Sequence, residues 1–276
     1  MKKLLAALLL APGLVLASSG EVKLDRAPVD TDNIPSLQRG AKVFVNYCLN
    51  CHSAGYMRYN RLQDLDLSVQ QIKDNLMFAA DKVGETMNVA LRTKDAAKWF
   101  GVAPPDLTVI ARSRGADWLY TYMRTFYRDS SRPTGWNNVV FQNASMPHVL
   151  YGVQGVRPLT VVEVKETIDE KSGASAGYER HTAVYDSNGA RQYKLEKLTG
   201  MNHHSSIAYQ WGAPIGGRLN AGQYDELVAD LINYLVYMGE PAGNSRVQIG
   251  IYTMLFLVLL ILVSWLLKRA YWKDVH

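Results

Sequence analysis

The sequence predicts a mainly α-helical fold with a small β-rich insertion and one C-terminal transmembrane helix. Three observations carry this prediction. Apolar residues recur at helical spacing in several segments, the stretch 158–198 alternates instead, and a long uncharged apolar run lies close to the C-terminus. No internal repeat divides the 276 residues, so one domain with an insertion is the simplest organisation.

The first twenty residues have the pattern of an export signal. Residues 1–20 read MKKLLAALLLAPGLVLASSG, with a basic start at Lys2 and Lys3, an apolar run too short to span a bilayer, and small residues near Ala17. We therefore expect a signal peptide, followed by an exported domain over residues 21–246.

Both cysteines of the chain lie in one short motif, YCLNCHSAG, which follows a predicted helix over residues 36–47. A structural zinc site would need four ligands, and neither a second cysteine pair nor a His-x3-5-His pattern lies nearby. A thioredoxin-like dithiol would start a helix after a strand, whereas this pair falls at a helix end. The motif therefore favours a third chemistry.

In the pattern Cys-x-x-Cys-His, two sulfurs form thioethers to a haem edge and the adjacent imidazole binds the iron. Cys48 and Cys51 are the predicted attachment sites, and His52 is the predicted axial metal ligand. We expect one covalently attached haem c inside a c-type cytochrome fold. Because both thiols are then used, the haem and not a disulfide would anchor the core.

The sixth iron ligand is predicted from the methionines. Most of them fall on predicted helices or in the membrane run, where packing is the usual role. Met146 instead lies on an extended loop, FQNASMPHVLYG, where Pro147 disfavours helix at the methionine. Met146 is the predicted metal ligand. His148 remains a rival that would give bis-histidine ligation and a lower potential, and an open iron site would suit catalysis or gas binding.

Two segments after the cysteine motif predict amphipathic helices. In the first, Ser68 is a helix N-cap with Gln71 three residues later, the spacing of a capping box. The second is residues 116–127, ADWLYTYMRTFY, in which Leu119, Met123 and Phe126 share one face.

A third amphipathic helix is predicted to start at Asn220, with Gln223 completing a capping box, and to stop at Gly239 and Pro241. We expect it to pack against the helix that precedes Cys48.

The β-rich stretch 158–198 contains Asn188-Gly189 between two alternating runs, which predicts a hairpin. A surface insertion or a flap that docks a partner would both explain it.

The apolar run Val247–Leu267 is uncharged and close to the roughly 20 residues that a helix needs to cross a bilayer. Lys268, Arg269 and Lys273 follow it, so the positive-inside rule places the tail, residues 268–276, in the cytoplasm. Most of the formal charge of +5 lies in the signal and the tail. The nearly neutral exported part lacks the basic surface of a nucleic-acid-binding protein.

Four features in order carry a family resemblance: RGAKVFVNYCLNCHSAGYMRY, APPDLTVIARSRGADWLY, MPHVLYG, and an amphipathic helix that ends in GEP before a C-terminal span. Together they resemble cytochrome c1, the haem subunit of the ubiquinol:cytochrome c oxidoreductase (cytochrome bc1) complex, over most of residues 34–270. The simple export signal indicates a bacterial member.

The resemblance implies a set of residues that contact the haem: Cys48, Cys51, His52, Pro104, Pro105, Arg114 and Met146. In it, Pro104 and Pro105 line the haem edge, and Arg114 pairs with a propionate, a role for which a guanidinium is suited. Arg112 could exchange roles with Arg114.

The resemblance also implies the function: electron transfer from the Rieske iron-sulfur protein to a cytochrome c, beside cytochrome b. It implies no catalytic residue on this subunit. The expected location is the bacterial cell membrane, with the haem domain in the periplasm. The alternatives are a membrane-anchored monohaem cytochrome of another respiratory complex, or a haem protein with an open iron site.

Overall fold

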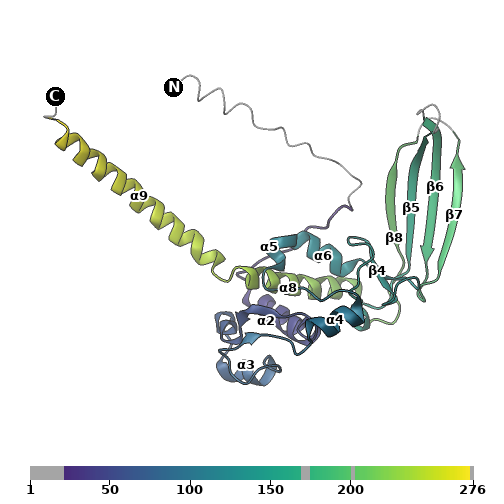
Figure 1. Ribbon diagram of the computed structural model, residues 1–276, viewed down its shortest axis with the longest axis horizontal. Coiled ribbons are helices and arrows are strands. Elements are labelled where there is room, and N and C mark those ends of the chain that lie inside the picture. The colour runs from purple at the N-terminus through teal and green to yellow at the C-terminus, as the bar shows by residue number, and fades with distance from the viewer. Residues whose placement is uncertain (1–21, 169–174, 200–202, 274–276) are drawn as a thin grey trace. The chain divides into compact units, whose positions relative to one another are not determined.

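The computed structural model describes residues 22–168, 175–199 and 203–273, and Figure 1 shows how its elements follow one another. The export signal predicted for residues 1–20 lies outside these residues. The helical elements are α2 (Ile34–Val43), η1 (Phe44–Cys48), η2 (Tyr59–Leu65), α3 (Val69–Asn75), α4 (Thr93–Phe100), α5 (Ile110–Arg114), α6 (Ala116–Arg124), α7 (Tyr151–Gln154), α8 (Ala221–Gly239) and α9 (Gly243–Tyr271). The strands are β1 (Ala54–Arg58), β2 (Thr86–Met87), β3 (Phe126–Arg128), β4 (Trp136–Asn138), β5 (Leu159–Ile168), β6 (Ser175–Tyr185), β7 (Arg191–Leu198) and β8 (Ser206–Trp211).

The packing of α8 on α2 is confirmed, and a glycine explains how close the two helices come (Figure 1). A Cβ atom at Gly40 would lie 2.0 Å from the backbone oxygen of Asp230 and 2.7 Å from Cβ of Tyr234. The side chain of Asp230 accepts hydrogen bonds from Ser36 and Arg39 on α2. The helix that leads to the cysteine motif is thus held firmly against α8.

Both predicted capping boxes are present, on α3 (Ser68 with Gln71) and on α8 (Asn220 with Gln223). The helix predicted over residues 116–127 is shorter than expected. It ends at Arg124, and Phe126 belongs to β3, where it pairs with Asn138 of β4. The β-branched and aromatic run that follows Arg124 favours an extended strand once a partner strand is available.

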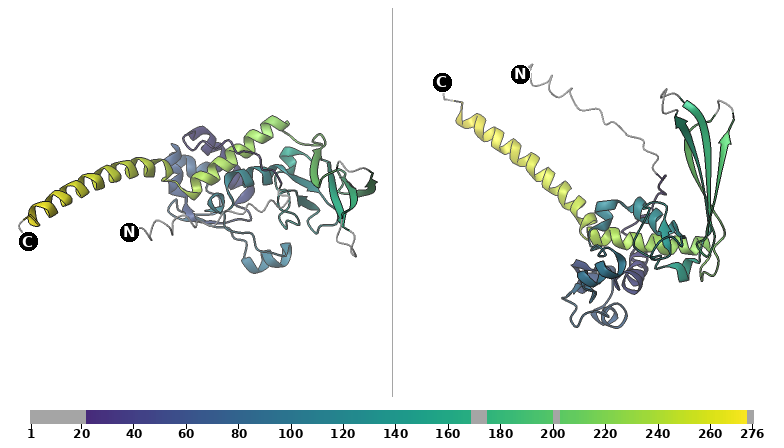
Figure 2. Two further views of the ribbon diagram at one scale, coloured as in Figure 1. Left: turned by 90° about the horizontal axis from the view of Figure 1, so that it is seen from above. Right: turned by 45° about the vertical axis from the view of Figure 1, so that its right-hand side comes forward.

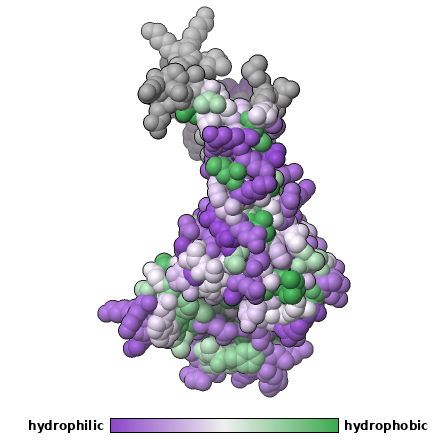
Figure 3. All heavy atoms as spheres, turned by 90° about the vertical axis from the view of Figure 1, so that its right-hand side faces the viewer, coloured by the Kyte–Doolittle hydropathy of each residue, from purple (hydrophilic) through white to green (hydrophobic). Residues whose placement is uncertain are grey.

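The β-rich stretch forms a larger sheet than the sequence indicated, and the views in Figure 2 show its strands in one layer. The strand order is β7-β6-β5-β8, so β8 extends the sheet beyond residue 198. The predicted turn joins β6 to β7, with Gly189 at φ 87°. In the view of Figure 3, hydrophobic side chains are scattered among hydrophilic ones. The helical core is confirmed, but strands make up more of the chain than the expected small insertion.

The apolar run near the C-terminus is one continuous helix, as predicted. Within α9, Ser245–Tyr271 is long and apolar enough to cross a membrane, and its apolar stretch is not buried against the rest of the chain. A helix that exposes apolar side chains all round is suited to lipid or to a membrane partner. The chain therefore has a C-terminal helix consistent with a single-pass anchor.

Candidate haem site

The cysteine motif sits where α2 ends in a widened turn, η1, which finishes at Cys48. The backbone N–H groups of Cys51 and His52 both donate to the carbonyl of Cys48, at 3.1 and 2.9 Å. This tight turn brings the two cysteines and the histidine together at the helix end. Both thiols are free, Cys48 buried and Cys51 partly buried.

The buried environment of the Cys48 thiol argues against its use as a redox nucleophile. Burial, and secondly the charge of Cys51, raise the pKa of the Cys48 thiol to about 12. A reactive cysteine needs a lowered pKa, because the thiolate is the nucleophile. Cys48 therefore lacks the environment of a redox-active thiol.

The imidazole of His52 is oriented by the segment that contains the two prolines. Its Nδ1 lies 2.8 Å from the carbonyl oxygen of Pro105. Because a carbonyl only accepts, Nδ1 carries the proton and Nε2 keeps its lone pair for a metal. Burial lowers the pKa of His52, opposed by the bond to Pro105 and the charge of Asp106, which favours the neutral imidazole.

Two further bonds align residues 104–107 with the stretch after His52. The backbone N–H of Leu107 donates to the carbonyl of Ser53 at 2.8 Å, and that of Gly55 donates to Asp106 at 2.7 Å. Pro104 is partly buried and Pro105 exposed. The structure thus brings the Pro-Pro-Asp-Leu motif directly beside the Cys-x-x-Cys-His motif.

Met146 and Arg114 lie at two ends of an aromatic pair on α6. The Tyr122 hydroxyl donates to Sδ of Met146 at 3.6 Å, and Trp118 stacks on Tyr122 with ring centroids 4.8 Å apart. The guanidinium of Arg114 lies over Trp118, 5.0 Å from the ring centroid. Sequence reasoning missed Trp118 and Tyr122, although their spacing of four residues on a helix places both rings on one face.

The structure distinguishes Arg112 from Arg114. Arg112 forms an ion pair with Glu240 at 3.2 Å, and Glu240 also pairs with Arg246 near the start of α9. Arg112 is therefore directed to the junction of α8 and α9, while Arg114 lies on the side of Trp118. The pairing of Arg114 with a haem propionate stays a prediction from the resemblance.

The rival ligand His148 is enclosed. It is 1% exposed, its ring stacks on Phe126 at 5.0 Å, and its Nε2 donates to Oε1 of Gln154 at 2.7 Å. Burial lowers the pKa of His148 to about 4, with the bond to Gln154 opposing the shift. Its position is that of a neutral core histidine held by a glutamine that the sequence did not single out.

The other candidate methionines lie in different settings. Met87 is fully buried and accepts a hydrogen bond from the Tyr234 hydroxyl at 3.8 Å, and Met57 is 2% exposed. Met201 lies outside the described residues. Met146 is partly buried on a loop, where its Sδ accepts from the Tyr122 hydroxyl.

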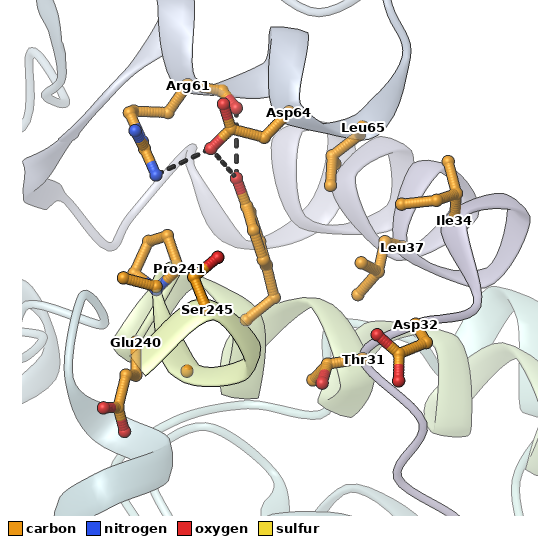
Figure 4. Close-up of a pocket in the computed structure, with 13 residues that line it drawn as sticks. Thr31, Asp32, Ile34, Leu37, Arg61, Asp64, Leu65, Glu240, Pro241 and Ser245 are labelled. Carbon is orange, nitrogen blue, oxygen red and sulfur yellow. Dashed lines mark hydrogen bonds and ion pairs between the residues drawn. The ribbon is translucent and has the colours of Figure 1, made fainter. Parts of the chain in front are cut away.

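A cavity of about 680 Å³ lies between η2, α2 and the start of α9, and neither the cysteine motif nor Met146 lines it (Figure 4). In its wall, Asp64 accepts from Arg61 at 2.6 Å and from the Tyr237 hydroxyl at 2.9 Å. The described residues contain no cluster of three or more His, Cys, Asp or Glu side chains that could hold a metal ion by itself. Among the described residues, neither the cavity nor another group of side chains offers an alternative metal centre.

The residues at the cysteine motif fit a covalent haem. Two free thiols, one imidazole with an available Nε2, and a proline segment bonded to that imidazole meet at one helix end. Thioether formation removes both thiols, and iron coordination uses the neutral imidazole that the geometry provides.

Comparison with known proteins agrees with this fit. The model of the cytochrome C1 family matches residues 25–156. The chain is 42% identical to a cytochrome c1 of Allochromatium vinosum over 279 aligned residues, covering all of both chains. It is also 42% identical to a protein of Nitrosomonas europaea named ammonia monooxygenase gamma subunit, covering all of this chain and 99% of that one. A cytochrome c1 of Rhodospirillum rubrum is 24% identical over 97% of this chain and 96% of the relative. The chain belongs to the cytochrome c1 family and carries, as members of that family do, one covalently attached c-type haem.

Proposed function

We propose that this subunit takes one electron at a time from the Rieske iron-sulfur protein and delivers it to a cytochrome c, within a bc1 complex that also contains cytochrome b. The 42% identity to a cytochrome c1 over the full length of the chain supports membership in such a complex. The observation that carries the site is the bond from His52 to Pro105, because it prepares one imidazole nitrogen for iron beside the two thiols. The haem supplies a one-electron iron couple.

Each residue of the site has a definite task in this proposal. Cys48 and Cys51 would form the two thioethers to the haem, and His52 and Met146 would be the ligands of its iron. A thioether ligand raises the reduction potential and closes the iron to small molecules, which suits electron transfer. The remaining residues, Pro104, Pro105 and Arg114, would line the haem edge and neutralise a propionate.

The proposed topology has four parts: a signal peptide over residues 1–20, a periplasmic haem domain over 21–246 with its β-rich insertion, a membrane helix over 247–267, and a cytoplasmic tail over 268–276. Lys268 and Arg269 in the last turn of α9 support this orientation through the positive-inside rule. Modification of engineered cysteines at each end by a membrane-impermeant reagent would test it.

Purification in a mild detergent tests the proposed complex. We expect the tagged chain to copurify with a dihaem cytochrome b and a Rieske protein, and to be reduced by quinol in their presence. A chain that purifies without them, or with a different oxidoreductase, would contradict the proposal. The name of the Nitrosomonas europaea relative makes a different membrane complex the natural alternative outcome.

The ligation is tested separately with carbon monoxide. A six-coordinate iron with His52 and Met146 leaves the reduced spectrum unchanged by carbon monoxide. Ready binding of the gas would instead show an open iron site.

A further inference from the structure

The loop that carries Met146 is fixed at both ends. Before the methionine, the backbone N–H of Asn143 donates to Oδ1 of Asn137 at 2.8 Å, and Asn143 adopts a positive φ of 62°. After it, the ring of His148 is held between Phe126, at 5.0 Å, and Trp136, at 5.2 Å. The position of Met146 is therefore set by two anchors close to it in sequence.

Gln154 completes the second anchor. Its side chain is 4% exposed, and its Oε1 accepts from Nε2 of His148 at 2.7 Å. A Cβ atom at Gly217 would lie 2.4 Å from the Gln154 carbonyl, so a glycine is needed for this close backbone approach. Val153 accepts from the backbone of both Arg218 and Leu219. Gln154 is thus held rigidly by its own surroundings and can hold His148 in turn.

The buried ring of His148 makes only one of its two possible hydrogen bonds. Among the described residues, Nδ1 of the buried His148 ring has no hydrogen-bond partner. An unsatisfied buried polar atom is destabilising, so packing alone would favour an apolar residue at this position. An imidazole at this position could also replace the methionine as iron ligand. Two residues of chain span at most about 7 Å, so a released His148 could compete with Met146 for the same iron face.

We propose that Gln154 is a positioning residue for the axial methionine: by holding the buried imidazole of His148, it keeps His148 off the iron and leaves the sixth position to Met146. This inference rests on the proposed ligation by His52 and Met146. Imidazole in place of thioether lowers the reduction potential. The hydrogen bond of Gln154 therefore determines the potential of the subunit without touching the haem.

The test replaces Gln154 by methionine, which preserves the volume of the side chain and removes the acceptor. Full-length chain is examined in the detergent-purified complex by redox titration and by the charge-transfer absorption of the methionine–iron bond in the oxidised form. For Gln154→Met we expect that band to lose at least half of its intensity and a second component of lower potential to appear. In the double variant Gln154→Met with His148→Leu, we expect the band and the single potential to return.

Val153→Ala is the matched control. Val153 is buried in the same short helix but makes no bond to His148 through its side chain, so the variant should lose stability and keep both the band and the potential. An unchanged band and potential in Gln154→Met would overturn the inference, as would a double variant that fails to recover. If the unsubstituted chain lacks the methionine–iron band, the proposed ligation fails instead, and the two failures are distinguishable.

Discussion

Nδ1 of His52 lies 2.8 Å from the carbonyl oxygen of Pro105, a residue 53 positions later in the chain. This contact links the two most informative motifs of the sequence, and it determines which nitrogen of the imidazole is available. The carbonyl of Pro105 orients the ring and leaves Nε2 free, so in the proposed ligation the proline pair would position the imidazole for the iron. Such a bond raises the basicity of Nε2 and limits rotation of the ring.

Replacement of Met146 by leucine is expected to lower the midpoint potential and slow the quinol-dependent reduction of the subunit, because the thioether that stabilises the reduced iron is lost. Redox titration of membranes and stopped-flow reduction by quinol measure the two effects. Met57→Leu, at a buried methionine next to the cysteine motif, serves as the control and should leave the potential in place. An unchanged potential in Met146→Leu would remove this residue from the ligand role.

Replacement of Arg114 by glutamine is expected to lower the midpoint potential more than the same change at Arg112. A cation beside a propionate disfavours the additional positive charge of the oxidised iron, so its removal favours oxidation. Arg112 is engaged by Glu240, and its loss should mainly affect the junction of α8 and α9. Parallel redox titrations compare the two variants. A larger shift for Arg112→Gln would reverse the proposed assignment.

Gly40→Ala is expected to reduce the free energy of unfolding by about 3 kcal/mol or more, because overpacking forces two well-packed helices apart. The added methyl group would meet the backbone of Asp230 at 2.0 Å, and backbone cannot rotate away. Urea unfolding of the full-length chain in detergent measures the loss. Gly222→Ala, whose added methyl group would lie at an ordinary 3.6 Å from Oδ1 of Asn220, should be neutral or stabilise by up to about 1 kcal/mol. Equal stability of the two variants would contradict a close crossing of α2 and α8.

Asp129 provides a prediction about pH. Burial raises the pKa of its carboxyl, but bonds from Ser131 and Asn137 outweigh this, and the net pKa is lowered. A folded-state pKa below the unfolded value means that the carboxylate contributes stability above the unfolded pKa, near 3.9, and loses it as the pH falls through the folded value.

Asp129→Asn should therefore destabilise the chain by about 1–3 kcal/mol at neutral pH, with the difference from the unsubstituted chain shrinking in acid. Unfolding by urea across the pH range measures this, and Asp81→Asn at an exposed position is the control. A difference that grows in acid would show that the sign is wrong.

The local features of the fold were predictable because neighbouring residues determine them. The capping boxes at Ser68 and Asn220, the turn at Asn188-Gly189 and the apolar C-terminal helix all follow from side chains within a few positions. The end of α6 was not predictable in this way. Phe126 fits a helical face by spacing, and only its pairing with Asn138 of β4 turns it into a strand.

The sequence by itself determined the chemistry of the site, because two thiols and an imidazole at one helix end admit few uses. These three residues lie within five positions of one another, so the covalent chain alone keeps them close. The tertiary structure decided which distant groups serve that chemistry, because His52 meets Pro105, Arg112 meets Glu240 and His148 meets Gln154 only once the helices have packed. Hydrogen bonds depend on distances of a few tenths of an ångström between residues far apart in the chain, and no local pattern of residues encodes those distances.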